Sequence, residues 1–552
     1  MDADTTPAPL THRQVLVVFS GIMLGMFLAA IDQTIVATAL PTIAGELGGL
    51  SHLSWVVTAY LLAETVATPL YGKLGDLYGR KRVFQSAIVL FLAGSVLCGL
   101  SASMGQLVAF RAIQGAGAGG IIVGAQALIA DIVSPRERGR YQGYFGAVFG
   151  LSSVAGPLIG GFLTEHASWR WVFYVNLPIG LVALVVTSIV LPASIRRERV
   201  RIDWLGTTVL SAAIVCLVLV TTWGGNEHAW GSPLIVGLSA AAVVLGVVFV
   251  LVERRVEEPA IPLRLFRNRT FNIASAVSLI IGAGMFGAIS YLPTFLQIGG
   301  GVSESNSGLL LVPVMAGLLM SSIAAGRRVS RTGRYRHFPI AGMAVAAVGM
   351  GLLSTLDTGS SRLESGAYMF VLGAGLGMVM QILVLATQNE APVADLGVAT
   401  STVTFFRVVG GSLGVALAGS LINSRLSSAL GGEPPSDLTP ELLRSLPAEE
   451  RAVLSTAYAD AITAVFAYAV PVLLVGFALT WLLRAVPLRT VAARVAAASE
   501  AAGAEPAAHH ATVEAAEVRV DGAAAPPNGS SSSGAAPADM MDGVGPSSTS
   551  GG

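Results

Sequence analysis

The stretch Tyr71–Phe84 reads YGKLGDLYGRKRVF and lies between two long apolar runs, at 53–71 and 83–101. Each run is close to the roughly 20 apolar residues that a helix needs to cross the hydrocarbon core of a bilayer. A short Gly-rich segment that carries one acid and four bases between two such runs is typical of a connection on the cytoplasmic side of a membrane. The sequence therefore predicts two membrane-spanning helices joined by a charged turn.

The composition agrees with a membrane protein. Hydrophobic residues make up 53% of the chain and charged residues only 12%, whereas soluble domains are about 25% charged. The 33 basic and 33 acidic residues balance, so the net charge says nothing about a nucleic-acid partner. The partners that we expect are a lipid bilayer, protons and a small amphipathic substrate, and no nucleic acid. Cys98 and Cys216 each lie inside an apolar run, which predicts buried thiols and neither a disulfide nor a metal site.

Apolar runs of similar length recur along the chain and predict an all-α polytopic membrane protein with fourteen spans. An even number of spans places both termini on the same side of the membrane. The N-terminus lacks the basic start of a secretory signal, so the first run should remain as a span. The expected spans are 14–40, 53–71, 83–101, 105–131, 141–164, 171–192, 204–223, 233–252, 271–296, 307–325, 337–355, 367–387, 397–422 and 460–484.

Basic residues orient these spans. The connections after even-numbered spans are rich in Lys and Arg, for example Arg136, Arg196 and Arg327, whereas the opposite connections carry few, such as Arg170 and Arg362. Cytoplasmic connections are the ones enriched in Lys and Arg. Both termini are therefore expected in the cytoplasm, and we expect a multi-pass protein of the plasma or inner cell membrane.

A second basic segment predicts an internal repeat. Gly326–Arg336, GRRVSRTGRYR, aligns without a gap with Gly72–Arg82, GKLGDLYGRKR. If spans seven and eight are an insertion, each segment follows the second span of a six-span half, as in transporters built from two related halves. Ser330 replaces Asp76, so the second copy should lack the interaction of that acid. A chance match of two basic loops is the alternative.

This repeat divides the chain into halves and appendages. After residue 494 the sequence is rich in Ala, Gly, Ser and Pro, which cannot form a buried core. The expected parts are a cytoplasmic N-terminus at 1–13, an N-terminal six-helix half at 14–192, two inserted spans at 204–252, a C-terminal six-helix half at 271–484 with an outside loop at 423–460, and a disordered cytoplasmic tail at 485–552.

Asp32 and Arg111 are ionisable residues inside expected spans, where charge is costly and usually functional. Burial favours the protonated form of a lone carboxylate, so Asp32 is a candidate proton carrier. Arg111 stays charged and needs a partner, and Asp32 is the simplest one. The alternatives are a packing or capping role for Asp32 and an Arg111 that bonds only to local carbonyl groups.

Glu64 and Arg407 are two further ionisable residues inside expected spans. Glu64 follows Tyr60 by one helical turn and shares its face, so it is either a second proton site, a contact for a cationic substrate, or a hydrogen-bonded structural acid. Arg407 precedes a glycine-rich stretch, which indicates close helix packing. Arg407 is a candidate for substrate contact, and the alternatives to that role are extension of its side chain to the cytoplasmic face or bonding to local carbonyl groups.

The fifth expected span contains GLSSVAGPLIGG. Its proline removes one backbone hydrogen bond and should kink the helix, and its glycines should leave one side of the helix nearly bare for close packing. These residues are Gly150, Gly156, Pro157, Gly160 and Gly161.

These motifs together resemble a known family. The pattern G-x-L-x-D-x-x-G-R-K-R at Gly72–Arg82 resembles the signature loop of the major facilitator superfamily, and G-x(5)-G-P-x-x-G-G resembles the motif of its antiporter members. DQTIVATALP, RAIQGAGAGG, WRWVFYVNLPIG and PLRLFRNRTF resemble the fourteen-span drug:proton antiporters of the EmrB/QacA type. The resemblance covers about residues 14 to 485.

The resemblance implies roles for particular residues. Asp32 and Arg111 would carry proton coupling, and an amphipathic, often cationic, compound would leave the cell. We add Glu64 as a candidate for proton coupling because of its position within a span. The signature segment, with Gly72, Asp76, Gly79, Arg80 and Arg82, would close the cytoplasmic gate together with Asp131. Residues that we expect in the substrate cavity are Tyr60, Gln114, Tyr291, Gln297 and Arg407.

Other classes of function fit the sequence less well. GAGAGG lies inside a span and G-x-x-x-x-G-K-[ST] is missing, so neither a phosphate loop nor a dinucleotide fold is indicated. We expect no cofactor other than the proton gradient, no metal site, no enzymatic activity and a monomer. A channel is disfavoured by the repeat and the buried acid. The main alternative is an exporter of the same fold whose cargo is a lipid, a siderophore or a self-made antibiotic.

Overall fold

The computed structural model describes residues 12–47, 53–133, 135–191, 203–225, 228–256, 258–299, 311–430 and 447–488. Within these ranges the regular structure is helical, apart from an isolated backbone bridge between Gly224 and His228. Most of the expected N-terminal segment, the middle of the expected outside loop and all of the expected tail beyond Leu488 lie outside the described residues.

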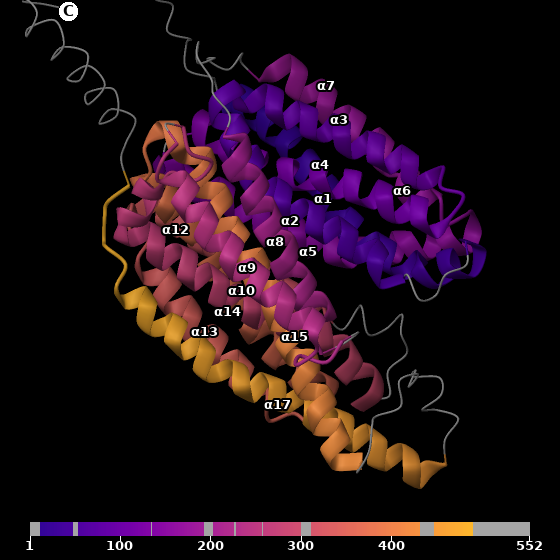
Figure 1. Ribbon diagram of the computed structural model, residues 1–552. Coiled ribbons are helices and arrows are strands. Elements are labelled where there is room, and N and C mark those ends of the chain that lie inside the picture. The colour runs from indigo at the N-terminus through magenta and orange to yellow at the C-terminus, as the bar shows by residue number, and fades with distance from the viewer. Residues whose placement is uncertain are drawn as a thin grey trace, which may run out of the picture. The chain divides into compact units, whose positions relative to one another are not determined.

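The N-terminal half consists of the helices drawn in indigo and purple in Figure 1. Its long helices follow the apolar runs, and caps mark some of their ends: the Ser103 hydroxyl accepts the backbone N–H of Gln106 at the start of α4, as N-cap side chains commonly do. The elements are α1 (His12–Leu47), α2 (Leu53–Tyr78), α3 (Arg80–Gly99), α4 (Met104–Ile132), α5 (Pro135–His166), α6 (Trp171–Tyr174) and α7 (Asn176–Val190).

The C-terminal half repeats the packing of the first. α2 packs on α4 as α12 packs on α14, α3 packs on α4 as α13 packs on α14, and α1 packs on α5 as α10 packs on α15. Helices at corresponding places in the two halves therefore pack in the same pairs, as the predicted internal repeat requires. The elements are α10 (Arg269–Thr294), the π-helix η3 (Phe295–Gly299), α12 (Val312–Thr332), α13 (His337–Leu353), α14 (Arg362–Glu390), the short helix η4 (Val393–Asp395), α15 (Leu396–Leu430) and α17 (Ala448–Trp481).

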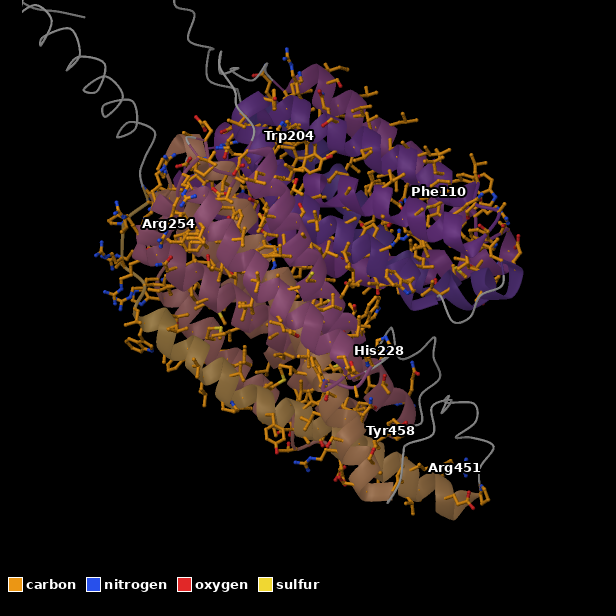
Figure 2. All side chains as sticks on the ribbon, viewed as in Figure 1. Phe110, Trp204, His228, Arg254, Arg451 and Tyr458 are labelled. Carbon is orange, nitrogen blue, oxygen red and sulfur yellow. The ribbon has the colours of Figure 1, made fainter. Side chains whose placement is uncertain are left out.

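Two further helices, α8 (Trp204–Trp223) and α9 (Pro233–Glu253), lie between the halves in sequence and pack on each other. Trp204 at the start of α8 and Arg254 after α9 lie at one end of this pair, and His228 lies at the other (Figure 2). α8 also contacts α2 and α15, whereas most of the apolar surface of α9 is exposed. An exposed apolar face of this size suits contact with lipid. The short helix η2 (Leu263–Arg267) follows.

Eleven helices in the described part of the chain are long and apolar enough to cross a membrane. Three further expected spans correspond to α2, α12 and α13, which do not belong to this set. α13 is apolar but only 17 residues long. The all-α polytopic architecture is therefore confirmed, while fourteen spans and two cytoplasmic termini remain predictions.

The segment that we expected to be a charged turn is almost entirely helical, so this expectation was wrong in detail. α2 continues to Tyr78 and α3 begins at Arg80, and Gly79 alone joins them, with φ 94°. In the second copy α12 likewise continues to Thr332 and ends at Gly333, with φ 69°. Left-handed backbone favours glycine at both joints. The two glycines aligned in sequence thus hold equivalent places in the fold.

The expected outside loop at 423–460 is also more helical than its composition indicated. α15 extends to Leu430 and α17 begins at Ala448, because Ser, Ala and Leu in these stretches support helix beyond the apolar run. Residues 431–446, between these helices, lie outside the described part of the chain.

The two halves meet chiefly along two pairs of helices, with smaller contacts of α14 with α5 and of α15 with α4. α5 of the first half packs against α12 of the second, and α2 of the first packs against α15 of the second. Within each half a separate apolar cluster forms the core, one around Phe84, Phe91 and Phe145 and the other around Leu372 and Phe466. The interface between the halves therefore depends on a few helices, and the residues on those helices can control its opening.

Candidate functional site

Asp32 in α1 is the centre of a buried polar cluster in the N-terminal half. Its carboxylate accepts hydrogen bonds from Arg111 Nη1 at 2.6 Å, from Gln114 Nε2 at 2.8 Å and from Asn176 Nδ2 at 2.8 Å. Gln114 and Asn176 also donate to the Ser95 hydroxyl. Asp32, Gln114, Asn176 and Ser95 are fully buried and Arg111 is 2% exposed. Three side-chain donors from α4 and α7 therefore converge on one carboxylate of α1.

Arg111 has several partners besides Asp32. Its Nη1 donates to Gln114 Oε1 at 2.8 Å and its Nε to the Val56 carbonyl at 3.4 Å. Its guanidinium lies 4.1 Å from the centre of the Tyr60 ring, at a distance that suits a cation–π contact. The predicted pairing of Arg111 with Asp32 is therefore present in the structure. A buried ion pair of this kind is costly to break, because one charge then remains unpaired.

Glu64 lies in α2 near this cluster. Its carboxylate accepts a 2.8 Å bond from Gln33 Nε2, which follows Asp32 in α1. Glu64 interacts electrostatically with Arg111 and with Arg407 of the opposite half. Arg407 is 6% exposed, and within the described part of the chain it forms no ion pair. Two opposite buried charges thus face each other across the contact of α2 with α15.

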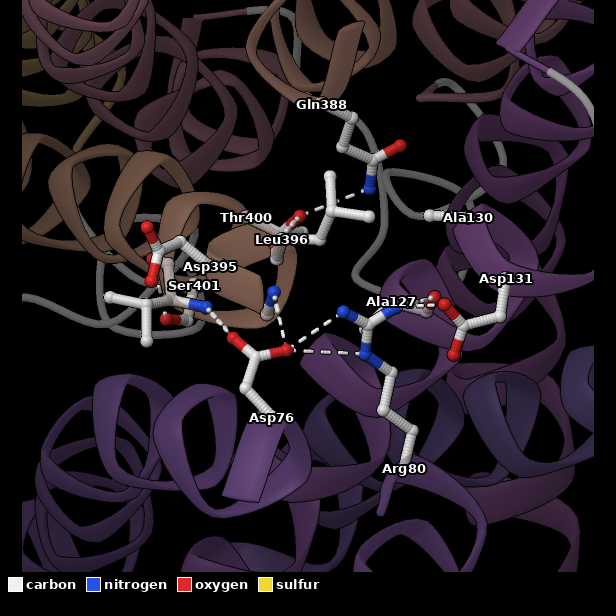
Figure 3. A network of polar contacts seen from close by, with 12 residues as sticks. Asp76, Arg80, Ala127, Ala130, Asp131, Gln388, Asp395, Leu396, Thr400 and Ser401 are labelled. Carbon is white, nitrogen blue, oxygen red and sulfur yellow. Dashed lines mark hydrogen bonds and ion pairs between the residues drawn. The ribbon is translucent and has the colours of Figure 1, made fainter. Parts of the chain in front are cut away.

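The signature segment binds the start of α15. Asp76 Oδ1 accepts the backbone N–H of Gly397 and Oδ2 accepts that of Val398, both at 3.0 Å (Figure 3). These N–H groups belong to the first turn of the helix, which lacks intrahelical partners and attracts negative charge. Arg80 donates to Asp76 at 2.7 Å and also pairs with Asp131 of α4. Asp76 therefore links the two halves, and Arg80 holds it in place.

Glycines allow this close approach. A Cβ atom at Gly72 would lie 2.3 Å from Ser401 Oγ and 2.7 Å from the Gly397 carbonyl oxygen. Gly79 supplies the left-handed joint that places Arg80 beside Asp76. Arg82, which we expected in the gate, is exposed on α3, so the structure does not bring it to this network.

A polar seam continues from the gate into the protein. Gln388 of α14 donates to the Thr400 hydroxyl (Figure 3). It also donates to the backbone carbonyl of Gln126 in α4. Thr404 donates to the side chain of Gln126 at 3.4 Å. Thr400, Thr404 and Arg407 share one face of α15, because helical positions i, i+4 and i+7 align. Arg407 therefore follows the seam on the face that meets the other half.

The second copy of the segment forms an equivalent contact. Ser330 Oγ accepts the backbone N–H of Arg140 in α5 at 2.8 Å, as Asp76 accepts that of Val398 in α15. A Cβ atom at Gly326 would lie 2.1 Å from the Gly139 carbonyl oxygen, which matches the approach of Gly72 to Gly397. The expectation that Ser330 loses the interaction was therefore only half right: the charge is lost but a neutral acceptor remains.

The glycines of α5 do not share one bare face, contrary to our expectation. A Cβ atom would lie 2.0 Å from Thr34 Oγ1 at Gly156 and 2.4 Å from Thr38 Oγ1 at Gly160, so these two allow α1 to approach closely. Gly150 instead faces Met315 of α12, and no atom lies within 4 Å of a Cβ at Gly161. The reason is that positions 150, 156, 160 and 161 point in different directions on a helix of 3.6 residues per turn. Pro157 lies inside α5 as predicted.

The residues expected around a substrate cavity do not form one group. Tyr60 and Gln114 belong to the Asp32 cluster. Tyr291 near the end of α10 donates to the Val415 carbonyl at 3.3 Å, and Gln297 lies in η3. Arg407 alone faces the other half near Glu64. Within the described residues no group of three or more His, Cys, Asp or Glu could hold a metal ion.

Several polar residues of the site were not predicted. Asn176 belongs to WRWVFYVNLPIG, which we treated only as a family motif, and Ser95 and Gln33 are polar residues within expected spans. A search for uncharged polar side chains in apolar runs would have found all three.

Glu46 at the end of α1 accepts bonds from Trp169 and Arg170. The hydrogen bond from Arg170 is the main reason that the pKa of Glu46 is lowered.

The sequence and the fold match known proteins. The model of the Major Facilitator Superfamily matches residues 22–415. An uncharacterized MFS-type transporter of Mycobacterium tuberculosis (strain CDC 1551) is 48% identical over 480 residues, which cover 86% of this chain and 70% of that protein. The multidrug transporter protein MdtP of Bacillus subtilis is 40% identical over 430 residues, 78% of each chain. Multidrug resistance protein 3 of the same organism is 36% identical over 433 residues, 78% of this chain and 84% of that protein.

Two solved structures share the fold. The human organic anion transporter MFSD10 gives a TM-score of 0.57 at 16% identity, with 84% of this chain and 99% of that chain covered. A bacterial homolog of the human lysosomal transporter Spinster, in an inward-facing and unoccupied conformation, gives a TM-score of 0.54 at 17% identity, with 86% and 98% covered. At this identity the likeness concerns the fold alone.

Proposed function

The chain belongs to the major facilitator superfamily, and from that premise we propose that it is a proton-coupled antiporter that exports amphipathic, often cationic, compounds by alternating access. Membership of this family makes it a multi-pass membrane transporter rather than an enzyme. Relatives named multidrug transporter and efflux pump support export. The observation that carries the coupling mechanism is the buried carboxylate of Asp32 with its three donors.

Asp32 binds and releases the proton in this proposal. In the present arrangement Arg111, Gln114 and Asn176 stabilise the carboxylate. Protonation would remove the charge that Arg111 pairs with, and a buried arginine without a counter-charge is unfavourable. α1 and α4 would then separate or rearrange. Release of the proton on the other side of the membrane would restore the cluster.

Helix α1 connects this cluster to the interface between the halves. Thr34 lies two residues after Asp32 and donates to the Ser152 carbonyl of α5 at 2.9 Å. Gly156 and Gly160 let α5 pack directly on α1, and α5 also packs on α12 of the other half. A shift of α1 on protonation would thus move α5, and with it the contact between halves.

The bonds of Asp76 to the first turn of α15 and of Ser330 to the backbone N–H of Arg140 in α5 would hold one face of the transporter closed. By the distribution of basic residues this face is cytoplasmic. Bonds to a charged group contribute about 1.5–3 kcal/mol and neutral ones about 0.5–1.5 kcal/mol. The gate therefore opens when a conformational change of the helices offsets the few kcal/mol that these hydrogen bonds contribute.

Glu64 and Arg407 are the residues that we assign to substrate contact. Both are buried, both lie where the halves meet, and they have opposite charges. An acid at this place favours a cationic group on the substrate. Tyr60 lies one helical turn before Glu64 on the same face of α2, and its ring would add an aromatic surface for the substrate.

Transport in energised inside-out vesicles tests this proposal. Vesicles that contain the protein should take up fluorescent amphipathic cations when the lumen is acidic, and a protonophore should abolish the uptake. Vesicles without the protein are the control. If no dye of a chemically varied panel is transported, while a lipid or siderophore is, the exporter fold stands but the cargo proposed here is wrong. Uptake that persists after the pH gradient is collapsed would contradict proton coupling.

A further inference from the structure

The second copy of the signature segment differs from the first in its charge balance. In the first copy, Arg80 pairs with Asp76 and Asp131, and Lys73 pairs with Glu258 at 3.1 Å. In the second copy serine takes the place of Asp76, and Arg331 takes the place of Leu77. The same contact has therefore lost an acid and gained a base.

The helices that contact the two segments, α15 for the first copy and α5 for the second, differ in charge in the same direction. Ser330 bonds to the N–H of Arg140, at the place where Asp76 bonds to the N–H of Val398. An apolar side chain in one copy is thus replaced by a guanidinium in the other. Within the described part of the chain, Arg140, Arg327 and Arg331 form no ion pair.

These side chains surround a cavity of about 470 Å³ between α5 and α12. Its lining consists of Glu137, Arg140, Tyr141, Arg327, Ser330 and Arg331. Three guanidinium groups therefore face one carboxylate, and Glu137 itself has further interactions. A positively charged cavity of this kind attracts an anion.

Neighbouring groups hold the arginines in position. Arg140 and Arg327 both interact with the Tyr144 hydroxyl. Arg136 donates to the backbone carbonyl groups of Ser330 and Arg331, at 3.0 Å and 2.8 Å. All four arginines are solvent-exposed, and the bonds of Arg136 join α5 to α12 beside the cavity. Phe19 of α1 packs against Tyr141, with ring centres 4.8 Å apart, so an apolar surface borders it.

We propose that this cavity binds a phosphate group, carried by the headgroup of an acidic phospholipid or by a free phosphate ion. Planar guanidinium groups pair with phosphate oxygens through two hydrogen bonds at once. The phosphate would supply the negative charge that Asp76 supplies in the first copy. Basic pockets between helices at the membrane edge recognise lipid headgroups in this way.

A bound phosphate would join the two halves. Arg140 belongs to α5 of the first half, whereas Arg327 and Arg331 belong to α12 of the second. A ligand that contacts both helices favours the conformation in which they lie together. Acidic lipid would therefore stabilise the state in which this face is closed.

Thermal unfolding of the purified full-length protein in an uncharged detergent tests the site without any transport assay. The probes are dihexanoyl phosphatidylglycerol, dihexanoyl phosphatidylcholine and inorganic phosphate. We expect phosphatidylglycerol to raise the unfolding midpoint by several degrees and the rise to saturate. Phosphatidylcholine should act weakly, because its ammonium group would lie beside three arginines. A response to both phosphatidylglycerol and inorganic phosphate identifies a general phosphate site, and a response to phosphatidylglycerol alone identifies a lipid site.

Variants separate this cavity from unspecific binding of anions. Arg331→Gln alone, and Arg327→Gln with Arg331→Gln, should lose most of the midpoint shift. Arg334→Gln is the matched control, because Arg334 is an exposed arginine of the same segment that does not line the cavity. An equal shift in the double variant and in the control would overturn the proposal. So would a wild-type protein that responds to neither phosphatidylglycerol nor phosphate.

Discussion

Arg111 in α4 and Asp32 in α1 form a buried ion pair with 2.6 Å between Nη1 and Oδ2. Both side chains are at most 2% exposed, and the pair joins two residues that are 79 positions apart in the sequence. A pair in such surroundings is strongly affected by any change in charge, since removal of one partner costs about 3–5 kcal/mol. This sensitivity is what a proton-driven conformational change requires.

The gate residue Asp76 provides a first prediction. Asp76→Asn keeps the size of the side chain but removes the charge that Arg80 and the first turn of α15 bind. We expect export to fall at least tenfold at unchanged membrane insertion, since bonds to a charged group contribute about 1.5–3 kcal/mol. Dye efflux and the amount of protein in the membrane are the measurements. Ser330→Ala should have a smaller effect, because it removes one neutral bond.

Asp357→Asn is the control for that experiment, because Asp357 lies in an exposed turn between α13 and α14. If Asp76→Asn exported dye at the rate of this control, the segment would serve only to orient the protein in the membrane.

The packing of α5 on α1 provides a second prediction. Gly156→Val would bring a Cβ to within 2.0 Å of Thr34 Oγ1, so α1 and α5 would have to separate. Such overpacking typically costs about 1–3 kcal/mol. We expect a lower unfolding midpoint and slow transport. Gly161→Val is the matched variant, because no atom lies within 4 Å of its Cβ, and it should behave like wild type. Similar losses in both variants would contradict the proposed role of this contact.

Glu64 provides a third prediction. Glu64→Gln preserves the shape of the side chain but removes the charge that faces Arg407. If Glu64 contacts the substrate, the apparent affinity for a cationic dye should fall about tenfold, the value of one charge-assisted bond, with little change for an uncharged dye of similar size. Transport rates at several concentrations of the two dyes measure this. An equal loss of gradient-driven transport for both dyes would instead assign Glu64 to proton coupling.

The orientation in the membrane provides a fourth prediction. Single cysteines at Arg331 and Thr358, in a chain with Cys98 and Cys216 replaced by Ser, should differ in whole cells. Position 358 should react with an impermeant thiol reagent, and position 331 should react only after the cells are permeabilised. Labelling of position 331 in intact cells would reverse the orientation inferred from the basic residues.

The sequence was sufficient for the parts of the fold that depend on apolar length. The expected spans at 204–223 and 337–355 begin at the first residues of α8 and α13, because flanking polar residues limit the apolar runs. The positions of helix ends that depend on capping or on bonds to distant parts of the chain could not be predicted from the sequence. Asp76 bonds to α15, and α2 therefore continues to Tyr78 where the sequence indicated a turn.

The site was predictable where charge was involved and not elsewhere. Asp32 and Arg111 could be paired from the sequence, because a charge in a membrane needs a counter-charge. Asn176 and Ser95 are neutral, and their place beside Asp32 depends on how α3 and α7 pack. Tyr291, which we expected in the substrate cavity, donates to the Val415 carbonyl of α15 and lies apart from the Asp32 cluster.

The central claim is that Asp32 carries the proton, and Asp32→Asn in vesicles tests it most directly. The variant keeps the shape of the protonated side chain but cannot release a proton. With an imposed pH gradient it should fail to concentrate the dye, while it should still exchange labelled for unlabelled dye across the membrane. Arg111→Lys, which retains a positive charge, should transport better than Arg111→Ala. If Asp32→Asn still concentrates dye in response to the gradient, Asp32 is not the proton carrier.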